Sequence, residues 1–117
     1  MKRDKPTSQE RVEHVIESIE AIQSFIKDHT EESLLKDLKT LSACLYQYTI
    51  IGEATAHIET SVLKKYSYPW HRVKAFRNNI LHEYFGIETN LIWDTSKKIL
   101  PELKTLMLEI LKNEYEA

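Results

Sequence analysis

The 117-residue chain has one cysteine, two glycines and three prolines. A single thiol, Cys44, excludes an internal disulfide, and its place in an apolar helical stretch predicts a buried small side chain, not a nucleophile. Because glycine and proline are scarce, the chain has few turns and long helices are expected. The length predicts one domain over residues 1–117, with a flexible start at residues 1–7.

Long apolar runs are missing as well. No stretch approaches the length that crosses a membrane, and the first residues, Met1 to Pro6, lack the apolar segment of a secretory signal. We therefore expect a cytoplasmic protein with no membrane partner. The four histidines His14, His29, His57 and His71 show no ligand spacing with cysteine or carboxylates, so neither a metal site nor a cofactor is predicted.

Hydrophobic periodicity predicts an all-α, up-and-down bundle of four main helices and one short helix. The expected helices cover residues 8–27, 31–36, 37–58, 67–84 and 90–114. Thr7 with Glu10 predicts a capping box at the first start, and Thr30 and Asp37 are the expected caps of the next two helices. No strand pattern, repeat or low-complexity tract competes with this interpretation.

Each of the four main helices has a predicted apolar stripe. The stripes are Val12, Val15, Ile16, Ile19, Ile22 and Ile26; Leu38, Leu41, Leu45 and Tyr48; Val73, Phe76, Ile80 and Tyr84; and Ile92, Ile99, Leu103, Leu106 and Ile110. Trp70 and Trp93 are expected to anchor the core or an interface, and Tyr46 and Tyr48 are expected to pack.

Glycine and proline mark special positions in this pattern. Ser67 is the expected cap of the fourth helix, with Pro69 in its first turn, and Gly86 is expected just past its end. Pro101 predicts a kink in the last helix. Gly52, in the middle of the third helix, costs about 1 kcal/mol relative to alanine, so close approach of a neighbouring helix is expected there.

Charge is unevenly distributed. Net charge is −2, yet residues 61–82 contain five basic residues and no acidic one, which leaves eleven basic against eighteen acidic residues elsewhere. The five are Lys64, Lys65, Arg72, Lys74 and Arg77. A local positive potential attracts phosphates even on a slightly acidic protein. The alternative is a solvated basic helix face.

The basic segment ends in Phe76-Arg77-Asn78-Asn79-Ile80-Leu81-His82-Glu83-Tyr84. Arginine can clamp a phosphate through two parallel hydrogen bonds, and histidine can move protons near neutral pH. Arg77 and His82 are five positions apart in the sequence, which places them roughly 140° apart on an ideal helix. They do not share a face by spacing alone, whereas Asn78 and His82, four apart, do.

This segment resembles the signature of HEPN-domain proteins: Arg77, a polar residue directly after it, His82, and a tyrosine two residues further on. Residues 51–54 (Ile-Gly-Glu-Ala), 68–70 (Tyr-Pro-Trp), 92–93 (Ile-Trp) and 100–103 (Leu-Pro-Glu-Leu) follow the order of the HepT-like subgroup. The resemblance implies a homodimeric, metal-independent ribonuclease toxin of helical fold. A small nucleotidyltransferase antitoxin would neutralise it.

Roles follow from the resemblance. Arg77 would stabilise phosphate charge, His82 would act as general base or acid, and Asn78 would orient one of them during attack of a ribose 2′-OH on the adjacent phosphorus. DNA, which lacks that hydroxyl, is not an expected substrate. Tyr84 matches the family tyrosine that receives AMP from the antitoxin.

Three further points stay open from the sequence. Glu53 either faces solvent or contacts a residue of the basic site and supports it. Lys64, Lys65, Arg72 and Lys74 are weaker candidates for RNA binding. The rival function is a noncatalytic helical adaptor that binds a nucleotide or a protein, in which His82 only caps its helix.

Overall fold

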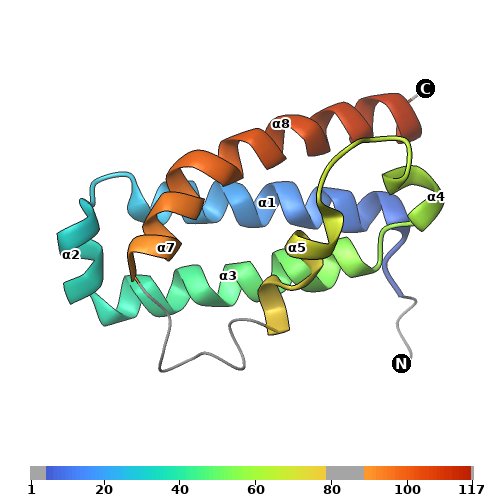
Figure 1. Ribbon diagram of the computed structural model, residues 1–117. Helices are drawn as coiled ribbons and strands as arrows, with labels where there is room; N and C mark the ends of the chain where they lie inside the picture. The colour runs from blue at the N-terminus through green and yellow to red at the C-terminus, as the bar shows by residue number, and fades with distance from the viewer. Residues whose placement is uncertain (1–4, 79–88, 117) are drawn as a thin grey trace.

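The computed structural model describes residues 5–78 and 89–116, and these residues form an all-α bundle (Figure 1). The helices are α1 (Ser8–Ile26), α2 (Glu31–Lys36), α3 (Leu38–Ala56), α4 (Thr60–Leu63), α5 (Trp70–Lys74), α7 (Thr89–Asp94) and α8 (Leu100–Ile110). α1 lies between α3 and α8 and packs against both, while α5 packs on α3. The part of the chain that the structure describes contains no strand.

The first three predicted helix starts are confirmed. Thr7 Oγ1 accepts a hydrogen bond from the Glu10 backbone N–H at 3.1 Å, and Glu10 Oε1 accepts one from the Thr7 N–H at 3.0 Å. Thr30 caps α2 through the Ser33 N–H at 3.1 Å, and Asp37 caps α3. These side chains satisfy N–H groups that have no partner inside the helix, which fixes where each helix begins.

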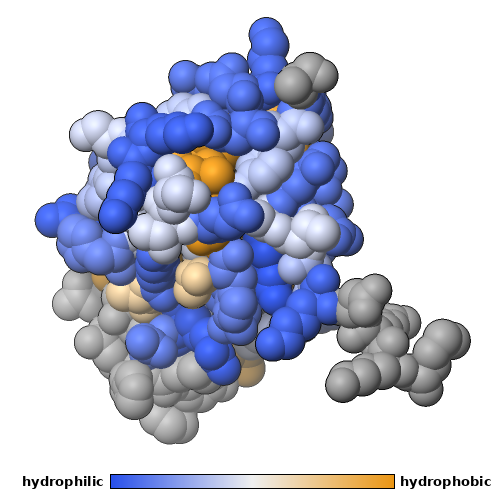
Figure 2. Space-filling model, turned by 90° about the vertical axis from the view of Figure 1, so that its right-hand side faces the viewer, coloured by the Kyte–Doolittle hydropathy of each residue, from blue (hydrophilic) through white to orange (hydrophobic). Residues whose placement is uncertain are grey.

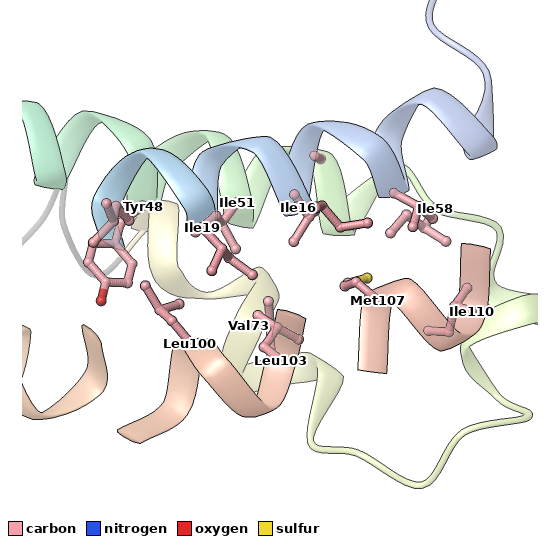
Figure 3. Packing of buried hydrophobic residues seen from close by; sticks show 14 of the residues in the cluster. Ile16, Ile19, Tyr48, Ile51, Ile58, Val73, Leu100, Leu103, Met107 and Ile110 are labelled. Atoms are coloured by element: carbon pink, nitrogen blue, oxygen red, sulfur yellow. The ribbon is translucent and has the colours of Figure 1, made fainter. Parts of the chain in front are cut away.

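One apolar core joins the helices. The α1 stripe from Val12 to Ile26 is buried throughout, as predicted. Figure 3 shows side chains of α1, α3, α5 and α8 pointing toward one another, with Val73 supplied by α5. Tyr48 donates a hydrogen bond of 2.6 Å to Ser96 Oγ, which itself donates to the Ile92 carbonyl at 2.7 Å. This chain of bonds satisfies the buried hydroxyls of Tyr48 and Ser96.

Two core predictions in α3 are wrong. Leu38 and Tyr46 are 72% and 65% exposed. The buried face of α3 instead follows Cys44, Tyr48 and Ile51. Leu38 lies six residues before Cys44 and Tyr46 two residues after it, so both point roughly 120–160° away from this face.

The last helical region contains a register shift. A π-helical turn, Thr95–Ile99, separates α7 from α8, and a second π-helical segment, Leu111–Tyr115, follows α8. Each π turn holds one extra residue, so Leu100 is fully buried while Ile99, predicted in the stripe, is 39% exposed. The kink predicted at Pro101 stays a prediction: this proline lies in the first turn of α8, two residues after the π turn ends.

The fourth predicted helix differs from the structure. The helix, α5, begins at Trp70, three residues later than predicted, so Ser67 does not cap it. Pro69 occupies the N-cap position and makes no side-chain hydrogen bond. α5 ends at Lys74, a turn follows at Ala75, and residues 76–78 are helical again. Helix α4 was not predicted. The predicted helix end near residues 83–84 lies outside the described residues, as do Ile80 and Gly86.

Trp70 joins these short helices. Its indole N–H donates to the Leu63 and Tyr66 carbonyls at 3.0 and 3.1 Å. Its ring and that of Trp93 pack on the core, as predicted. The tryptophan thereby ties the start of α5 to the end of α4.

One end of the molecule is mainly polar. Figure 2 shows predominantly hydrophilic side chains on the end of the molecule near α4 and the C-terminal end of α8. Within residues 5–78 and 89–116, the helices lack the combination of length and apolar character that would span a bilayer.

The buried thiol leads to a first prediction. Cys44 is fully buried, and burial raises its pKa to about 11. Because only the thiolate is reactive, we expect native protein to resist iodoacetamide at pH 8 and urea-unfolded protein to react fully. Intact-mass spectrometry measures the labelling. Rapid stoichiometric labelling of folded protein would contradict the burial of Cys44.

Candidate functional site

The site begins with a close contact between α3 and the segment after α5. A Cβ placed on Gly52 would lie 2.8 Å from the Arg77 backbone N, 3.2 Å from Arg77 Cβ and 3.3 Å from the Lys74 carbonyl O. Any side chain larger than hydrogen would therefore push this segment away. The predicted close approach at Gly52 is confirmed, and its partner is the backbone of Arg77 itself.

The Arg77 side chain then turns back toward α3. Its Nη1 donates a hydrogen bond of 2.9 Å to Glu53 Oε2, and the two side chains are 52% and 42% exposed. Glu53 Oε1 also lies 3.7 Å from His57 Nδ1, whose N–H donates to the Glu53 carbonyl at 2.8 Å. Half-exposed ion pairs of this kind contribute little to stability, so a phosphate can displace Glu53 from the guanidinium at small cost.

Arg77 lies at the edge of an open groove of about 410 Å³ between α1 and α3. The groove is lined by Arg11, His14, Tyr46, Thr49, Ile50, Glu53, Ala54 and Arg77. A second hollow of about 440 Å³ continues from His14 and Ile50 toward Glu17 and Ala21. Both volumes are within the range of small-ligand sites.

Arg11 has an unsatisfied donor in this groove. Its Nε is buried and has no hydrogen-bond partner. No described carboxylate lies within ion-pair distance of its guanidinium. Among the described residues that line this groove, two are arginines, Arg11 and Arg77, and one is a carboxylate, Glu53. Glu53 pairs with Arg77 and leaves Arg11 without an acidic partner.

The other predicted basic residues are spread around this region. Lys64 and Arg72 are exposed and Lys74 is partly buried. Lys65 donates to Glu114 Oε1 at 2.8 Å, and this hydrogen bond raises the pKa of Lys65. Lys65 is therefore engaged with the C-terminal π-helical segment, and it is less available to a phosphate than Lys64.

The structure brings together some of the predicted site residues. Arg77 and Glu53 are in contact, and Asn78 follows on the same helical turn with an exposed side chain. His82 and Tyr84 lie outside the described residues. Within the described ranges, no three histidine, cysteine or acidic side chains are grouped so that they could hold a metal.

Sequence reasoning missed Arg11, His14 and Tyr46 as groove residues. Helical spacing could have indicated them: Arg11 and His14 are three apart on α1, while Tyr46 and Glu53 are seven apart on α3, so each pair shares a face. What the spacing could not indicate is that these two faces adjoin Arg77.

The Gly52 contact predicts an unusual response to a helix-favouring substitution. Gly52→Ala would normally stabilise a helix by about 1 kcal/mol, but overpacking against backbone costs about 1–3 kcal/mol. We expect a net loss of stability, measured as a lower Tm by circular dichroism. Ser42→Ala, at an exposed position of the same helix, is the control and should not lower Tm. A Gly52→Ala protein with raised Tm would contradict the close packing.

Comparison with known proteins places this chain in a family. Residues 15–110 match the HepT-like family, described as ribonuclease HepT-like. A protein of Caldanaerobacter subterraneus subsp. tengcongensis, named "Putative RNase", is 33% identical over 104 residues, or 88% of this chain and 93% of its own. A probable ribonuclease HepT of Thermococcus cleftensis is 32% identical over 101 residues, or 86% and 92%.

One relative is much longer. A Methanocaldococcus jannaschii protein, named "Gamma-glutamylcyclotransferase and putative RNase", is 33% identical over 100 residues; the match covers 85% of this chain but only 45% of the relative. No solved structure matches the chain significantly. With a family match over most of its length and relatives above 30% identity, the chain belongs to the HepT-like ribonuclease family.

Proposed function

We propose that the protein is a metal-independent endoribonuclease that cleaves RNA in the cytoplasm by transesterification. The observation that supports this most strongly is Arg77: in a chain of a ribonuclease family, its backbone is packed against Gly52 and its half-exposed guanidinium lies at an open groove. A fixed planar cation beside open space suits a phosphodiester.

The proposed reaction needs only groups of the chain and of the RNA. The ribose 2′-oxygen bonds to the adjacent phosphorus as its proton is removed, and the bond from phosphorus to the 5′-oxygen breaks as that oxygen gains a proton. The products are a 2′,3′-cyclic phosphate and a 5′-hydroxyl. His82 acts as base or acid, Arg77 stabilises charge on the nonbridging oxygens, and Asn78 orients His82 or the phosphate.

Glu53 has a positioning role in this proposal. Before RNA binds, its carboxylate holds the Arg77 guanidinium beside the groove at 2.9 Å. When a phosphate arrives, the guanidinium exchanges one anionic partner for another and does not have to be ordered first. Such preorganisation lowers the cost of binding the transition state.

A homodimer completes the proposed site. Arg77 and His82 are roughly 140° apart on an ideal helix, so one protomer does not align them by spacing. Twofold symmetry would bring two copies of each residue to one cleft. Lys64, Arg72 and Lys74 would guide the RNA backbone toward it by charge.

We further propose that the protein is the toxin of a toxin–antitoxin pair, controlled by a nucleotidyltransferase. The Tyr84 hydroxyl would bond to the α-phosphorus of ATP, with release of pyrophosphate. The attached AMP would add negative charge and bulk close to Arg77 and so compete with RNA for this cation. This part of the proposal depends on the family resemblance of Tyr84.

The ribonuclease proposal predicts cleavage of RNA, but not of DNA of the same sequence, in excess EDTA. We expect 2′,3′-cyclic phosphate ends, detected by mass spectrometry of the fragments. Arg77→Ala and His82→Ala should each lower the rate at least about a hundredfold, because each removes a charge-stabilising or proton-transfer group.

Matched controls lie outside the groove and the basic segment's proposed RNA contacts. His71→Ala and Lys39→Ala alter exposed side chains of α5 and α3, and they should change the rate only a few fold. Cleavage that stops in EDTA and returns with a divalent ion would overturn the proposed mechanism. Undiminished cleavage by Arg77→Ala or His82→Ala would overturn the assigned roles and favour a noncatalytic adaptor.

The regulatory proposal predicts one AMP adduct on Tyr84 after coexpression with the partner nucleotidyltransferase. Peptide mass spectrometry locates the adduct, and Tyr84→Phe should remove both the adduct and the loss of ribonuclease activity. Tyr46→Phe, at an exposed tyrosine of α3, should leave the adduct in place. An adduct at another residue, or neutralisation without any adduct, would rule out Tyr84 as the switch.

A further inference from the structure

The groove between α1 and α3 has features of a nucleic-acid subsite that the catalytic motif does not include. Its wall contains two guanidiniums from different parts of the chain, Arg11 and Arg77, with the imidazole of His14 beside them. Its rim contains the Tyr46 ring, which is 65% exposed. None of Arg11, His14 and Tyr46 has a role in the proposed chemistry.

Arg11 is the strongest indication of an anionic ligand. The guanidinium is partly buried, its Nε has no hydrogen-bond partner, and no described carboxylate pairs with it. A buried donor without a partner is costly, and the Arg11 guanidinium would gain partners by turning toward a phosphate in the groove. The other cation of the groove, Arg77, is already paired with Glu53.

Tyr46 is the second indication. The other aromatic residue of α3, Tyr48, is buried in the core, whereas Tyr46 is exposed at the edge of the groove. An exposed ring next to a cationic groove can stack on an unpaired base. The hydroxyl of Thr49, which also lines the groove, donates to the Tyr46 carbonyl at 2.6 Å, so it offers this wall only an acceptor.

We propose that this groove binds the nucleotide next to the cleaved phosphodiester of a single RNA strand, with Arg11 on its phosphate and Tyr46 stacked on its base. The proposal rests on the ribonuclease function proposed above. A volume of about 410 Å³ suits one nucleotide. The polar lining favours RNA over a second copy of the chain, since homodimer interfaces are more apolar than the rest of the surface.

Binding and cleavage together test the groove. Fluorescence anisotropy with a single-stranded 2′-O-methyl RNA measures binding without cleavage, and KM is measured on the same sequence as RNA. We expect Arg11→Gln and Tyr46→Ala each to weaken binding about tenfold and to raise KM by a similar factor. Arg11→Lys and Tyr46→Phe, which keep the charge and the ring, should recover most of the binding.

Lys39→Gln is the matched control, because Lys39 is an exposed cation of α3 that does not line the groove. It should change binding less than twofold. Circular dichroism establishes that each variant is folded, and sedimentation establishes its oligomeric state.

Three results would overturn the groove proposal. Arg11→Gln and Tyr46→Ala could bind and cleave like the native protein; Lys39→Gln could lose as much binding as Arg11→Gln; or Arg11→Gln and Tyr46→Ala could dissociate a dimer, which would make the groove an interface between copies. Each is distinct from failure of the ribonuclease proposal, in which the native protein itself does not cleave RNA.

Discussion

The packing of Gly52 against the Arg77 backbone is the constraint on which the site depends. Because no Cβ intervenes, α3 and the segment after α5 approach closely enough for Glu53 to contact the Arg77 guanidinium at 2.9 Å. The same contact brings Arg77 to the groove that α1 and α3 form. Two adjacent residues of α3 therefore determine where the backbone and the charged end of Arg77 lie.

In the proposed function, exchange of partners would let a protein with a net charge of −2 bind a polyanion. Glu53 neutralises Arg77, while Arg11 in the same groove has no acidic partner among the described residues. Long-range attraction would then come from the exposed lysines and arginines of residues 61–78, and short-range binding would come from the groove. The surface ion pair is weak enough to open.

Much of the fold could be predicted from the sequence, because caps and apolar spacing are local signals. Thr7, Thr30 and Asp37 begin their helices as predicted. The exposure of Ile99 could not be predicted, since the π turn that shifts its register is set by packing. At the site, Gly52 predicted a close contact, but its partner depends on the tertiary arrangement. The same holds for Arg11 and Tyr46, which are far from Arg77 in the chain.

The central claim is that the Arg77 guanidinium exchanges Glu53 for an RNA phosphate. The most direct measurement is the ¹⁵Nε–¹H resonance of Arg77 during titration with a 2′-O-methyl RNA. We predict that this resonance shifts saturably, with the affinity measured by anisotropy. Glu53→Gln should change the resonance in the free protein but not in the RNA-bound protein. An Arg77 resonance that stays unchanged at saturating RNA, in a preparation that cleaves RNA, would contradict it.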